Sequence, residues 1–284
     1  MTIWEGKERL KEAINVLYDD RESNNIAVLT IEWISGKNKV EQLLQKESTL
    51  TDQQILLLKN ALSRLSSGEP IQYIIGETWF MGLNFMVTKD VLIPRPETEE
   101  LVDWVIQSTL PFQHKKINVL DIGSGSGCIP ISLKKKVPFL QIQSIDISSS
   151  ALAIANLNAE KIGVSIDFKE IDFLDTSTWS NIPPVDLIIS NPPYIKEFEK
   201  KSMHQNVLEF EPHIALFVPD NDALLFYKAI YNFSKTHLLT NGSIYLEINE
   251  TLGKEVVDLF SDAGTLVEIR KDMQGKDRMI KIQK

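Results

Sequence analysis

From residue 117 onward, short apolar segments alternate with segments of helical spacing, and this alternation constrains the fold more than any other feature. Five segments have the length and β-branched character of buried strands, namely 117–121, 141–146, 166–171, 185–189 and 243–248. The spacing predicts helices over 128–136, 151–162, 224–239 and 252–263, and a closing hairpin over 266–270 and 278–282. This order predicts an α/β fold, with a mostly parallel, seven-stranded sheet, helices on both faces and a terminal antiparallel pair.

The fourth predicted strand ends in a stiff turn, Asn191-Pro192-Pro193-Tyr194. Proline cannot continue the ladder of a strand, and it biases the residue before it toward extended backbone. Ligands of open α/β sheets bind at the carboxyl ends of the strands. The turn is therefore either a plain strand terminus or part of an active site, and its residues alone leave both interpretations open.

The chemistry that this turn suits is a reaction at a planar nitrogen, whose lone pair is delocalised. The side-chain oxygen of Asn191 and the carbonyl oxygen of Pro192 can each accept one N–H. Together they would hold an –NH₂ group and orient its lone pair. The ring of Tyr194 would pack on the planar group or lie near a cationic methyl donor.

A glycine-rich turn, Gly123-Ser124-Gly125-Ser126-Gly127, follows the first predicted strand and precedes a helix. Glycines let the backbone approach a ligand, and the start of the helix presents free N–H groups. A dinucleotide-binding turn would need its third glycine at position 128, where Cys128 stands. The turn is therefore typical of a nucleoside cofactor site rather than of a pyrophosphate site.

Acidic residues end the second and third predicted strands. Asp146 lies about 20 residues beyond the glycine turn, where an acid can accept both hydroxyls of a ribose. It could instead cap the helix that begins near Ala151. Asp172 and Phe173 could hold the amino group of an adenine and stack on its ring, or be a loop residue and a core residue.

Residues 1–69 have helical spacing and no motif with chemistry, so they predict a helical domain that either packs on its neighbour or docks a partner. Thr51 and Gln54 form a predicted capping box. The apolar positions with this spacing are Leu10, Ala13, Ile14, Leu17, Ile26, Leu29, Thr30, Trp33, Val40, Leu43, Leu44, Leu57, Leu58, Ala61, Leu62 and Leu65.

Residues 70–92 predict a β-hairpin that links this domain to a third region, 93–284. The predicted strands are 71–75, 78–81 and 83–87, with Gly76 and Gly82 between them. The segment Ile93-Pro-Arg95-Pro-Glu97-Thr-Glu99 follows and predicts a helix that starts at Pro96. Farther along the chain, residues 197–211 predict a charged loop, and Asn241-Gly242 predicts a turn after the helix over 224–239.

Composition limits the classes of partner and compartment. Lys and Arg total 30 against 39 Asp and Glu, a net charge of −9 that supplies no general attraction for nucleic acid. A single cysteine excludes an internal disulfide and a cysteine-rich zinc site, and fits a reducing compartment. The first residues carry charges where a signal peptide would be apolar, and no apolar run approaches the ~20 residues of a membrane span. These features predict a soluble cytoplasmic protein that binds no metal.

The chain resembles the class I methyltransferases that use S-adenosylmethionine, because it combines the glycine turn, the acid Asp146 and the Asn-Pro-Pro-Tyr turn. Within these, the chain resembles the HemK/PrmC family, which methylates the glutamine side-chain amide of class I peptide chain release factors. The resemblance covers nearly the whole chain. It rests on Gly68-Glu-Pro-Ile-Gln-Tyr-Ile-Ile-Gly76, Ile93-Pro-Arg-Pro-Glu-Thr-Glu99, Asp121-Ile-Gly-Ser-Gly-Ser-Gly-Cys128, 185–195 and Lys271-Asp-Met-Gln-Gly-Lys-Asp-Arg278.

The resemblance implies direct transfer of the methyl group to the glutamine of a Gly-Gly-Gln motif, with S-adenosylhomocysteine as the product and no assigned general base. It also implies that residues 1–69 dock the release factor, that the start of the helix near Pro96 borders the active site, and that the protein is a monomer. The implied cofactor-binding residues are Gly123, Ser124, Gly125, Ser126, Gly127, Asp146, Ile147, Asp172, Phe173 and Asn191. The implied catalytic and substrate-binding residues are Asn191, Pro192, Pro193 and Tyr194, with Arg95 and Glu97 as further substrate-binding residues.

Two positions depart from the family pattern, and two other functions stay open. Asn249 stands where a glycine is usual, and Asn221-Asp-Ala replaces a turn that normally contains glycine, so the loop shapes there are in doubt. A methyltransferase acting on an amino group of adenine or guanine would share the Asn-Pro-Pro-Tyr turn, but it needs a basic groove. A scaffold that only binds the cofactor is disfavoured by three motifs at three strand ends.

Overall fold

The computed structural model describes residues 1–112, 115–261 and 264–284, and in it the chain divides into two units. The first consists of Met1–Glu77 together with His204–Phe210. The second consists of Thr78–Met203 together with Glu211–Lys284. The sequence did not anticipate that a short segment from the second half of the chain would group with the N-terminal helices.

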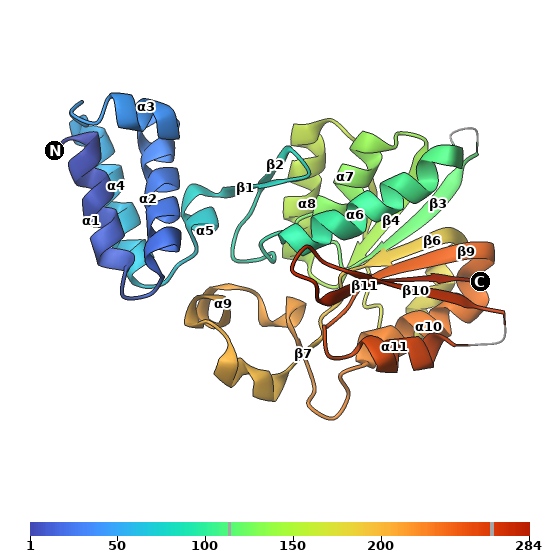
Figure 1. Ribbon diagram of the computed structural model, residues 1–284. Coiled ribbons are helices and arrows are strands. Elements are labelled where there is room, and N and C mark those ends of the chain that lie inside the picture. Colours follow the sequence, from blue (N-terminus) through green and yellow to red (C-terminus); the bar gives the residue numbers. More distant parts are fainter. Residues whose placement is uncertain (113–114, 262–263) are drawn as a thin grey trace. The chain divides into compact units, whose positions relative to one another are not determined.

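Helices make up the first unit (Figure 1). They are α1 (Ile3–Ile14), α2 (Asp20–Ser35), α3 (Lys39–Leu44), α4 (Asp52–Ser66), α5 (Ile71–Ile75) and α9 (Gln205–Phe210). The capping box predicted at the start of α4 is present, because the side chains of Thr51 and Gln54 each accept from the other's backbone N–H. Gly36 ends α2 in the left-handed conformation, with φ of 69°.

The buried face of these helices differs in part from the predicted one. Leu10, Ile14, Leu58 and Leu65 are in the core as expected. The apolar residues predicted to be buried but found exposed are Leu17, Leu29, Trp33, Val40, Leu43, Leu44 and Leu57. On α2 the inward stripe runs through Ile26, Ala27, Thr30, Ile31 and Ile34, which leaves Leu29 and Trp33 outside it, and α3 is too short to bury a face of its own.

The linker contains a helix where a strand was predicted. Residues 71–75 form α5 between Pro70 at its start and Gly76, whose φ of 84° ends it. A short apolar run has no period that separates strand from helix, so the strand prediction was wrong here. The hairpin that follows is present, with β1 (Glu77–Phe80) and β2 (Leu83–Met86) paired. Its two connecting residues, Met81 and Gly82, both have positive φ, which is typical of a type I′ turn.

Among the described residues of the second unit, seven strands form one sheet in the order β10-β11-β9-β6-β3-β4-β5. They are β3 (Ile117–Ile122), β4 (Leu140–Asp146), β5 (Asp167–Glu170), β6 (Val185–Ser190), β9 (Leu238–Glu247), β10 (Leu266–Lys271) and β11 (Asp277–Gln283). The β3, β4, β5, β6 and β9 pairings are parallel, whereas β11 is antiparallel to both of its neighbours. The predicted sheet is thus confirmed, together with its closing antiparallel hairpin.

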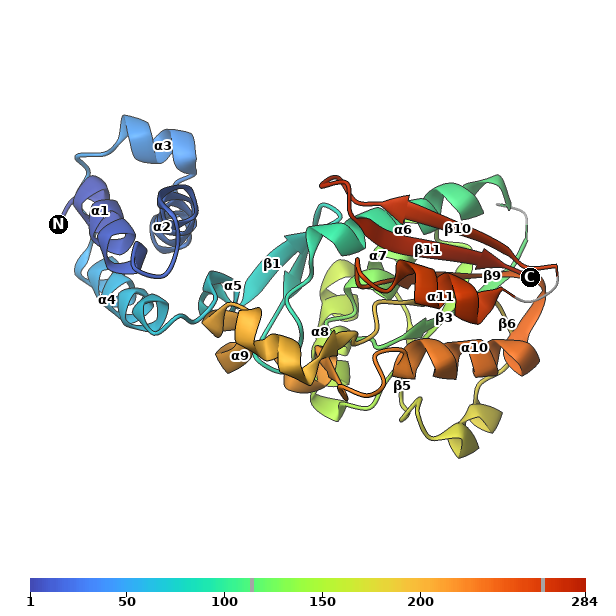
Figure 2. The same cartoon turned by 60° about the horizontal axis from the view of Figure 1, so that its bottom comes forward.

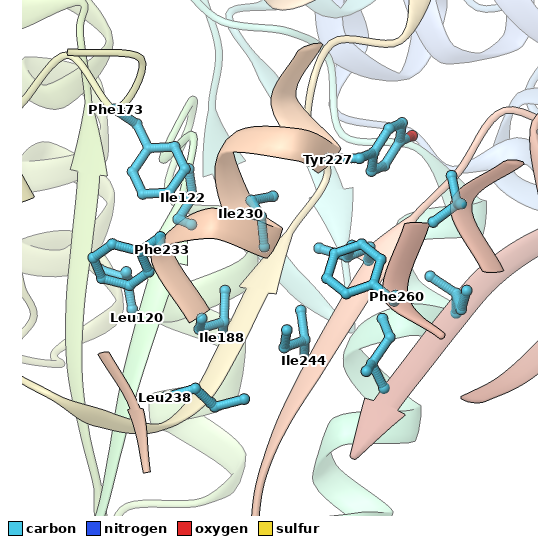
Figure 3. Close-up of a cluster of buried hydrophobic side chains, with 14 of the residues drawn as sticks. Leu120, Ile122, Phe173, Ile188, Tyr227, Ile230, Phe233, Leu238, Ile244 and Phe260 are labelled. Atoms are coloured by element: carbon cyan, nitrogen blue, oxygen red, sulfur yellow. The ribbon is translucent and has the colours of Figure 1, made fainter. Parts of the chain in front are cut away.

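Helices cover both faces of this sheet. One face packs on α6 (Pro96–Thr109), α7 (Cys128–Lys136) and α8 (Ser149–Ile162), and the other on α10 (Leu225–His237) and α11 (Gly253–Phe260) (Figures 1 and 2). Figure 3 shows the second of these interfaces, where Phe233 and Ile230 of α10 lie near Leu120 and Ile188 of the sheet, and Phe260 of α11 lies near Ile244. The two cores hold the strand ends, and hence the loops beyond them, in fixed positions.

Short elements complete the second unit. They are η1 (Leu110–Phe112), η2 (Thr176–Asn181), η3 (Glu197–Ser202), η4 (His213–Ala215) and a two-stranded sheet of β7 (Ile195–Lys196) with β8 (Phe217–Val218). The charged loop predicted over 197–211 is therefore wrong in part, since η3 and α9 lie within it. Each of these helical segments has only six residues, too few to show a helical period in the sequence.

Two helix ends also differ from prediction. The helix predicted over 224–239 ends at His237, and β9 begins at Leu238, so the turn predicted at Asn241-Gly242 lies inside a strand. There Asn241 has φ of 64° and the register shifts, because Val185 pairs with Leu238 but Leu187 pairs with Ser243. The helix predicted over 252–263 ends at Phe260, and residue 263 lies outside the described residues.

Candidate active site

A cavity of about 250 Å³ lies at the carboxyl ends of β3, β4, β5 and β6 in the second unit. The predicted site residues that line it are Arg95, Gly123, Ser124, Gly125, Ser126, Asp146, Ile147, Asp172, Phe173, Asn191, Pro192 and Pro193. Three other predicted site residues, Glu97, Gly127 and Tyr194, are not in its lining. Thr98, in the segment expected to border the site, also lines the cavity, and lining residues that the sequence did not indicate include Pro212, Ile214, Ala215 and Phe226.

The glycine turn forms one wall of the cavity through its backbone. Gly123 and Gly125 have φ of 86° and 52°, and a side chain added at either would meet no atom within 4 Å. Backbone N–H groups of Gly123 and Ser124 donate to the carbonyl of Ile145, at 2.9 and 3.0 Å, which ties the turn to β4. The open space above these two glycines is what lets a ligand approach the chain closely.

Gly127 has a different function from the two glycines before it. A Cβ at this position would lie 2.7 Å from Ile131 Cδ1 and 3.1 Å from Ala155 Cβ. Its φ is 79°, and the residue sits at the N-cap of α7. Gly127 therefore permits close packing of α7 against α8, and it does not itself border the cavity.

Asp146 ends β4 with its carboxylate held by backbone N–H groups. Oδ2 accepts from Gly125 at 2.9 Å and Oδ1 accepts from Ser148 at 2.9 Å. Burial raises the pKa of Asp146, and these N–H groups oppose that shift. The helix cap is Ser148, whose Oγ accepts from the backbone N–H of Ala151, so Asp146 is not the cap of α8. Each carboxylate oxygen retains a lone pair for a further donor.

Asp121, near the end of β3, is a buried acid next to the glycine turn but outside the cavity lining, and the sequence analysis did not single it out. Its side chain is fully buried, and Oδ2 accepts from Ser144 Oγ at 2.5 Å. Oδ1 has no hydrogen-bond partner among the residues that the structure describes. Burial, with a smaller contribution from the charge of Asp146, raises the pKa of Asp121 to about 8. An acid as the last polar residue before a glycine turn, inside an apolar strand, was the available signal.

Asn191 lines the cavity just beyond the end of β6 and belongs to a hydrogen-bonded network. Its Nδ2 donates to Thr98 Oγ1 at 3.1 Å, and Thr98 Oγ1 donates to Glu247 Oε2 at 2.6 Å. The hydroxyl of Tyr194 donates to Glu247 Oε1 at 3.1 Å. Glu247 ends β9 and is 2% exposed. The sequence indicated neither Thr98 as a partner of Asn191 nor Glu247 as part of the site.

Tyr194 lies behind the cavity wall rather than in it. Its ring packs against the core on the α10 side of the sheet. Burial, and then the charge of Glu247, raise the pKa of the Tyr194 hydroxyl well above its usual range. The tyrosine thus stays a neutral hydrogen-bond donor to Glu247, and its contribution to the turn is to anchor the residues that precede it.

Phe173 both lines the cavity and packs in the core. It stacks on Trp179 with ring centroids 5.6 Å apart and meets Phe233 edge to face at 5.4 Å. The alternatives of cofactor contact and core residue are therefore not exclusive. The Asp172 side chain accepts from the backbone N–H of Leu174 at 2.9 Å, which shapes the turn after β5.

Arg95 is fixed by an ion pair within the second unit. Its Nη2 lies 2.6 and 2.7 Å from the two carboxylate oxygens of Glu211, which is 5% exposed. Glu211 also accepts from the backbone N–H of Ile93 at 3.4 Å. This carboxylate therefore holds both the backbone and the side chain of the segment before α6. Glu97 lies outside the cavity and accepts from Gln274 Nε2 at 3.3 Å.

Neither metal nor thiol chemistry finds support in the described part of the chain. No cluster of His, Cys, Asp and Glu with metal-binding geometry occurs among the described residues. Burial raises the pKa of the Cys128 thiol to about 12, so this thiol stays protonated and is a poor nucleophile. Among the same residues, no helix is both long and apolar enough to cross a membrane.

The chain matches two family models, the PrmC N-terminal domain over residues 4–76 and the Methyltransferase small domain over residues 104–211. It is 43% identical over 284 residues to a release factor glutamine methyltransferase of Flavobacterium psychrophilum, with 99% of both chains covered. It is 37% identical over 272 residues to the protein of the same name from Bacteroides thetaiotaomicron, covering 95% of this chain and 96% of that one.

Likeness in three dimensions extends to proteins of low sequence identity. A protein from Streptococcus mutans assigned as a methyltransferase dependent on S-adenosylmethionine is 12% identical, with a TM-score of 0.52 over 73% of this chain and 55% of that one. At this identity the likeness concerns the fold alone. With the match to the Methyltransferase small domain, it confirms the predicted class of fold.

Proposed function

The chain belongs to the release factor glutamine methyltransferase family, and on this basis we propose that it transfers a methyl group from S-adenosylmethionine to the glutamine of a release factor. The acceptor is the side-chain amide nitrogen of the glutamine in the Gly-Gly-Gln motif. The observation that carries the proposal is the cavity itself, which has a glycine turn and acids on one side and the Asn191 turn on the other.

The residues on the glycine side fit a cationic nucleoside. Asp146 has lone pairs for the two ribose hydroxyls, and the space above Gly123 and Gly125 admits a ligand close to the backbone. Asp121 is buried outside the cavity lining, so a cationic ligand would act on its carboxyl through charge rather than through direct contact. When bound, S-adenosylmethionine supplies a methyl group that its sulfonium already activates, so no nucleophilic side chain is required.

Asn191 and Pro192 hold the acceptor amide in this proposal. The Asn191 side-chain oxygen accepts one N–H of the glutamine, and the Pro192 carbonyl accepts the other. Two directed bonds fix the plane of the amide and aim the nitrogen lone pair at the methyl group. Holding two reactants in near-attack geometry is enough to supply a large part of the rate enhancement. The amide loses its proton during or after the transfer.

The first unit is proposed as the docking surface for the release factor. A whole protein substrate needs contacts beyond one glutamine, and remote contacts can contribute binding energy that positions the reacting group. The exposed apolar side chains of this unit, among them Leu43, Leu44 and Leu56, offer such a surface.

The test is an acceptor assay with purified protein and methyl-labelled S-adenosylmethionine. Four acceptors are compared: a full-length release factor, the same factor with its Gly-Gly-Gln glutamine replaced by alanine, transfer RNA and duplex DNA. Label is expected only in the unmodified release factor. Label in either nucleic acid, or equal label in the alanine variant, would overturn the proposal, because the acceptor would then be a different nitrogen.

A further inference from the structure

Three side chains from distant parts of the second unit form a hydrogen-bonded relay, in which Asn191 and Thr98 line the cavity and Glu247 lies behind it. Glu247 comes from the end of β9, Thr98 from the first turn of α6, and Asn191 from the turn after β6. Thr98 is 3% exposed and Glu247 is 2% exposed. The Tyr227 hydroxyl donates to the backbone carbonyl of Glu247 at 3.1 Å, which fixes the position of this strand end.

Counting protons along the relay assigns a direction to each bond. A carboxylate has only acceptors, so ionised Glu247 must receive a proton from both of its hydroxyl partners, Thr98 and Tyr194. A threonine hydroxyl has one proton. Because that proton is committed to Glu247 at 2.6 Å, Thr98 Oγ1 can only accept from Asn191. The group of Asn191 that faces Thr98 is therefore its –NH₂.

The opposite orientation of the Asn191 amide carries a penalty. If the amide were turned over, its oxygen would face Thr98 Oγ1 with no proton between them. Alternatively, Thr98 would give its proton to Asn191 and leave a buried oxygen of Glu247 without a donor. Removing a hydrogen bond from a buried acceptor is unfavourable, and more so for a charged group. Burial raises the pKa of Glu247, and the hydrogen bonds from Thr98 and Tyr194, with the positive charge of Arg278, oppose that shift and favour the ionised carboxylate.

We propose that Thr98 and Glu247 are positioning residues that hold the Asn191 amide with its oxygen toward the acceptor substrate. This deepens the proposed function and rests on it for the identity of the substrate. An oxygen presented at that point binds an –NH₂ group and repels a carboxylate. The relay thus makes the site selective for a carboxamide over the corresponding acid, glutamine over glutamate.

Three substitutions on one helix test the relay. Thr98→Val keeps the shape of the side chain but removes the hydroxyl, and Thr98→Ser keeps the hydroxyl. Thr109→Val is the matched control, because Thr109 is a buried residue of α6 whose hydroxyl donates to the backbone carbonyl of Val105 at 2.9 Å, outside the relay. Affinity for S-adenosylmethionine and single-turnover methylation of a full-length release factor are measured for each.

The single-turnover rate of Thr98→Val is expected to fall about tenfold to 100-fold, as for a misplaced contact group, with unchanged cofactor affinity. Thr98→Ser is expected to recover most of the rate, and Thr109→Val to match the wild type. In competition, Gly-Gly-Gln and Gly-Gly-Glu peptides should differ less in inhibition of Thr98→Val than of wild type. A Thr98→Val rate equal to wild type, or a loss that serine does not recover, overturns the proposal.

A spectroscopic measurement on the wild type tests the relay without following a reaction. With asparagine side chains isotope-labelled and the Asn191 –NH₂ signal assigned by its loss in Asn191→Ser, hydrogen exchange is compared with that of exposed Asn60. Slow exchange at Asn191 is expected, because its –NH₂ donates to Thr98. Exchange as fast as at Asn60 overturns the relay. A protected signal without methylation of any release factor would instead leave the relay intact and remove the proposed function.

Discussion

The two sides of the cavity are built in different ways. On the glycine side the contacts come mainly from the backbone, such as the N–H groups of Gly125 and Ser148 on Asp146. On the acceptor side they come from side chains far apart in the sequence, with Thr98 and Glu247 supporting Asn191. The first side is preorganised by turn geometry, and the second depends on the whole sheet placing three elements together.

This difference implies that substitutions can impair the cofactor side and the acceptor side of the cavity independently. Changes on the glycine side should act on cofactor affinity, because the groups there would touch the cofactor alone. Changes on the acceptor side should act on the rate of transfer at saturating cofactor. Kinetics separates these effects when binding and single-turnover chemistry are measured independently.

The largest effect is expected from Asn191→Ala. The variant loses one of two acceptors that orient the glutamine amide, and we expect the single-turnover rate to fall about 100-fold or more. Cofactor affinity, measured by calorimetry, should stay near that of the wild type. Comparable single-turnover rates in the two proteins would show that the acceptor is held elsewhere.

Asp146→Ala should have the next largest effect, and on the opposite quantity. Loss of a charged hydrogen-bond acceptor for the ribose is expected to cost roughly 1.5–3 kcal/mol of S-adenosylmethionine binding free energy. The rate at saturating cofactor should change much less. If calorimetry on the folded variant gives unchanged affinity, the carboxylate serves only the turn, through Gly125 and Ser148.

Two glycines of the same turn should differ in stability when replaced by alanine. Gly127→Ala adds a Cβ 2.7 Å from Ile131 at positive φ, and about 2 kcal/mol of unfolding free energy should be lost through strain and overpacking. Gly123→Ala meets no neighbouring atom, so only the left-handed backbone is strained, at about 1 kcal/mol. Denaturant titration of both variants measures the difference. Equal losses would contradict the packing role of Gly127.

The smallest effect is expected from pH. The pKa of Asp121 is about 8 without ligand, and a bound cation would lower it. Below pH 8, binding therefore requires this carboxyl to release a proton, which weakens binding. Affinity for S-adenosylmethionine should therefore rise from pH 7 to pH 9 by about tenfold at most. Asp121→Asn at the same pH values controls for titration of the cofactor itself. A pH dependence that persists in Asp121→Asn would assign it to another group.

Much of the second unit could be predicted from sequence because its signals are local. The helix over 128–136 and the closing hairpin were placed correctly from apolar period and turn residues alone. The Gly123–Gly127 turn and Asn191 were placed at the same edge of the sheet, because parallel strands bring their carboxyl ends together. Functional motifs whose residues lie close to the end of one strand can be recognised in the sequence.

What could not be predicted depends on contacts between distant residues. Glu247 has no local motif, and its importance follows only from the meeting of β9 with α6 and the turn after β6. The grouping of His204–Phe210 with the first unit is of the same kind, including the hydrogen bond of Asn206 to Tyr18 at 3.4 Å. The secondary-structure prediction for the short apolar run 71–75 was wrong for another reason, because five residues are too few to show a strand or helix period.

The most direct test of the account is the location of the transferred methyl group. A release factor incubated with the protein and S-adenosylmethionine is digested, and tandem mass spectrometry locates the added methyl on the peptide that contains Gly-Gly-Gln. The account predicts one methyl group on the side-chain amide of that glutamine. It predicts no methyl group there when the Asn191→Ala variant is incubated for the time that the wild type needs for one turnover. A methyl group on any other residue, or on the glutamine at an equal rate with Asn191→Ala, would contradict it.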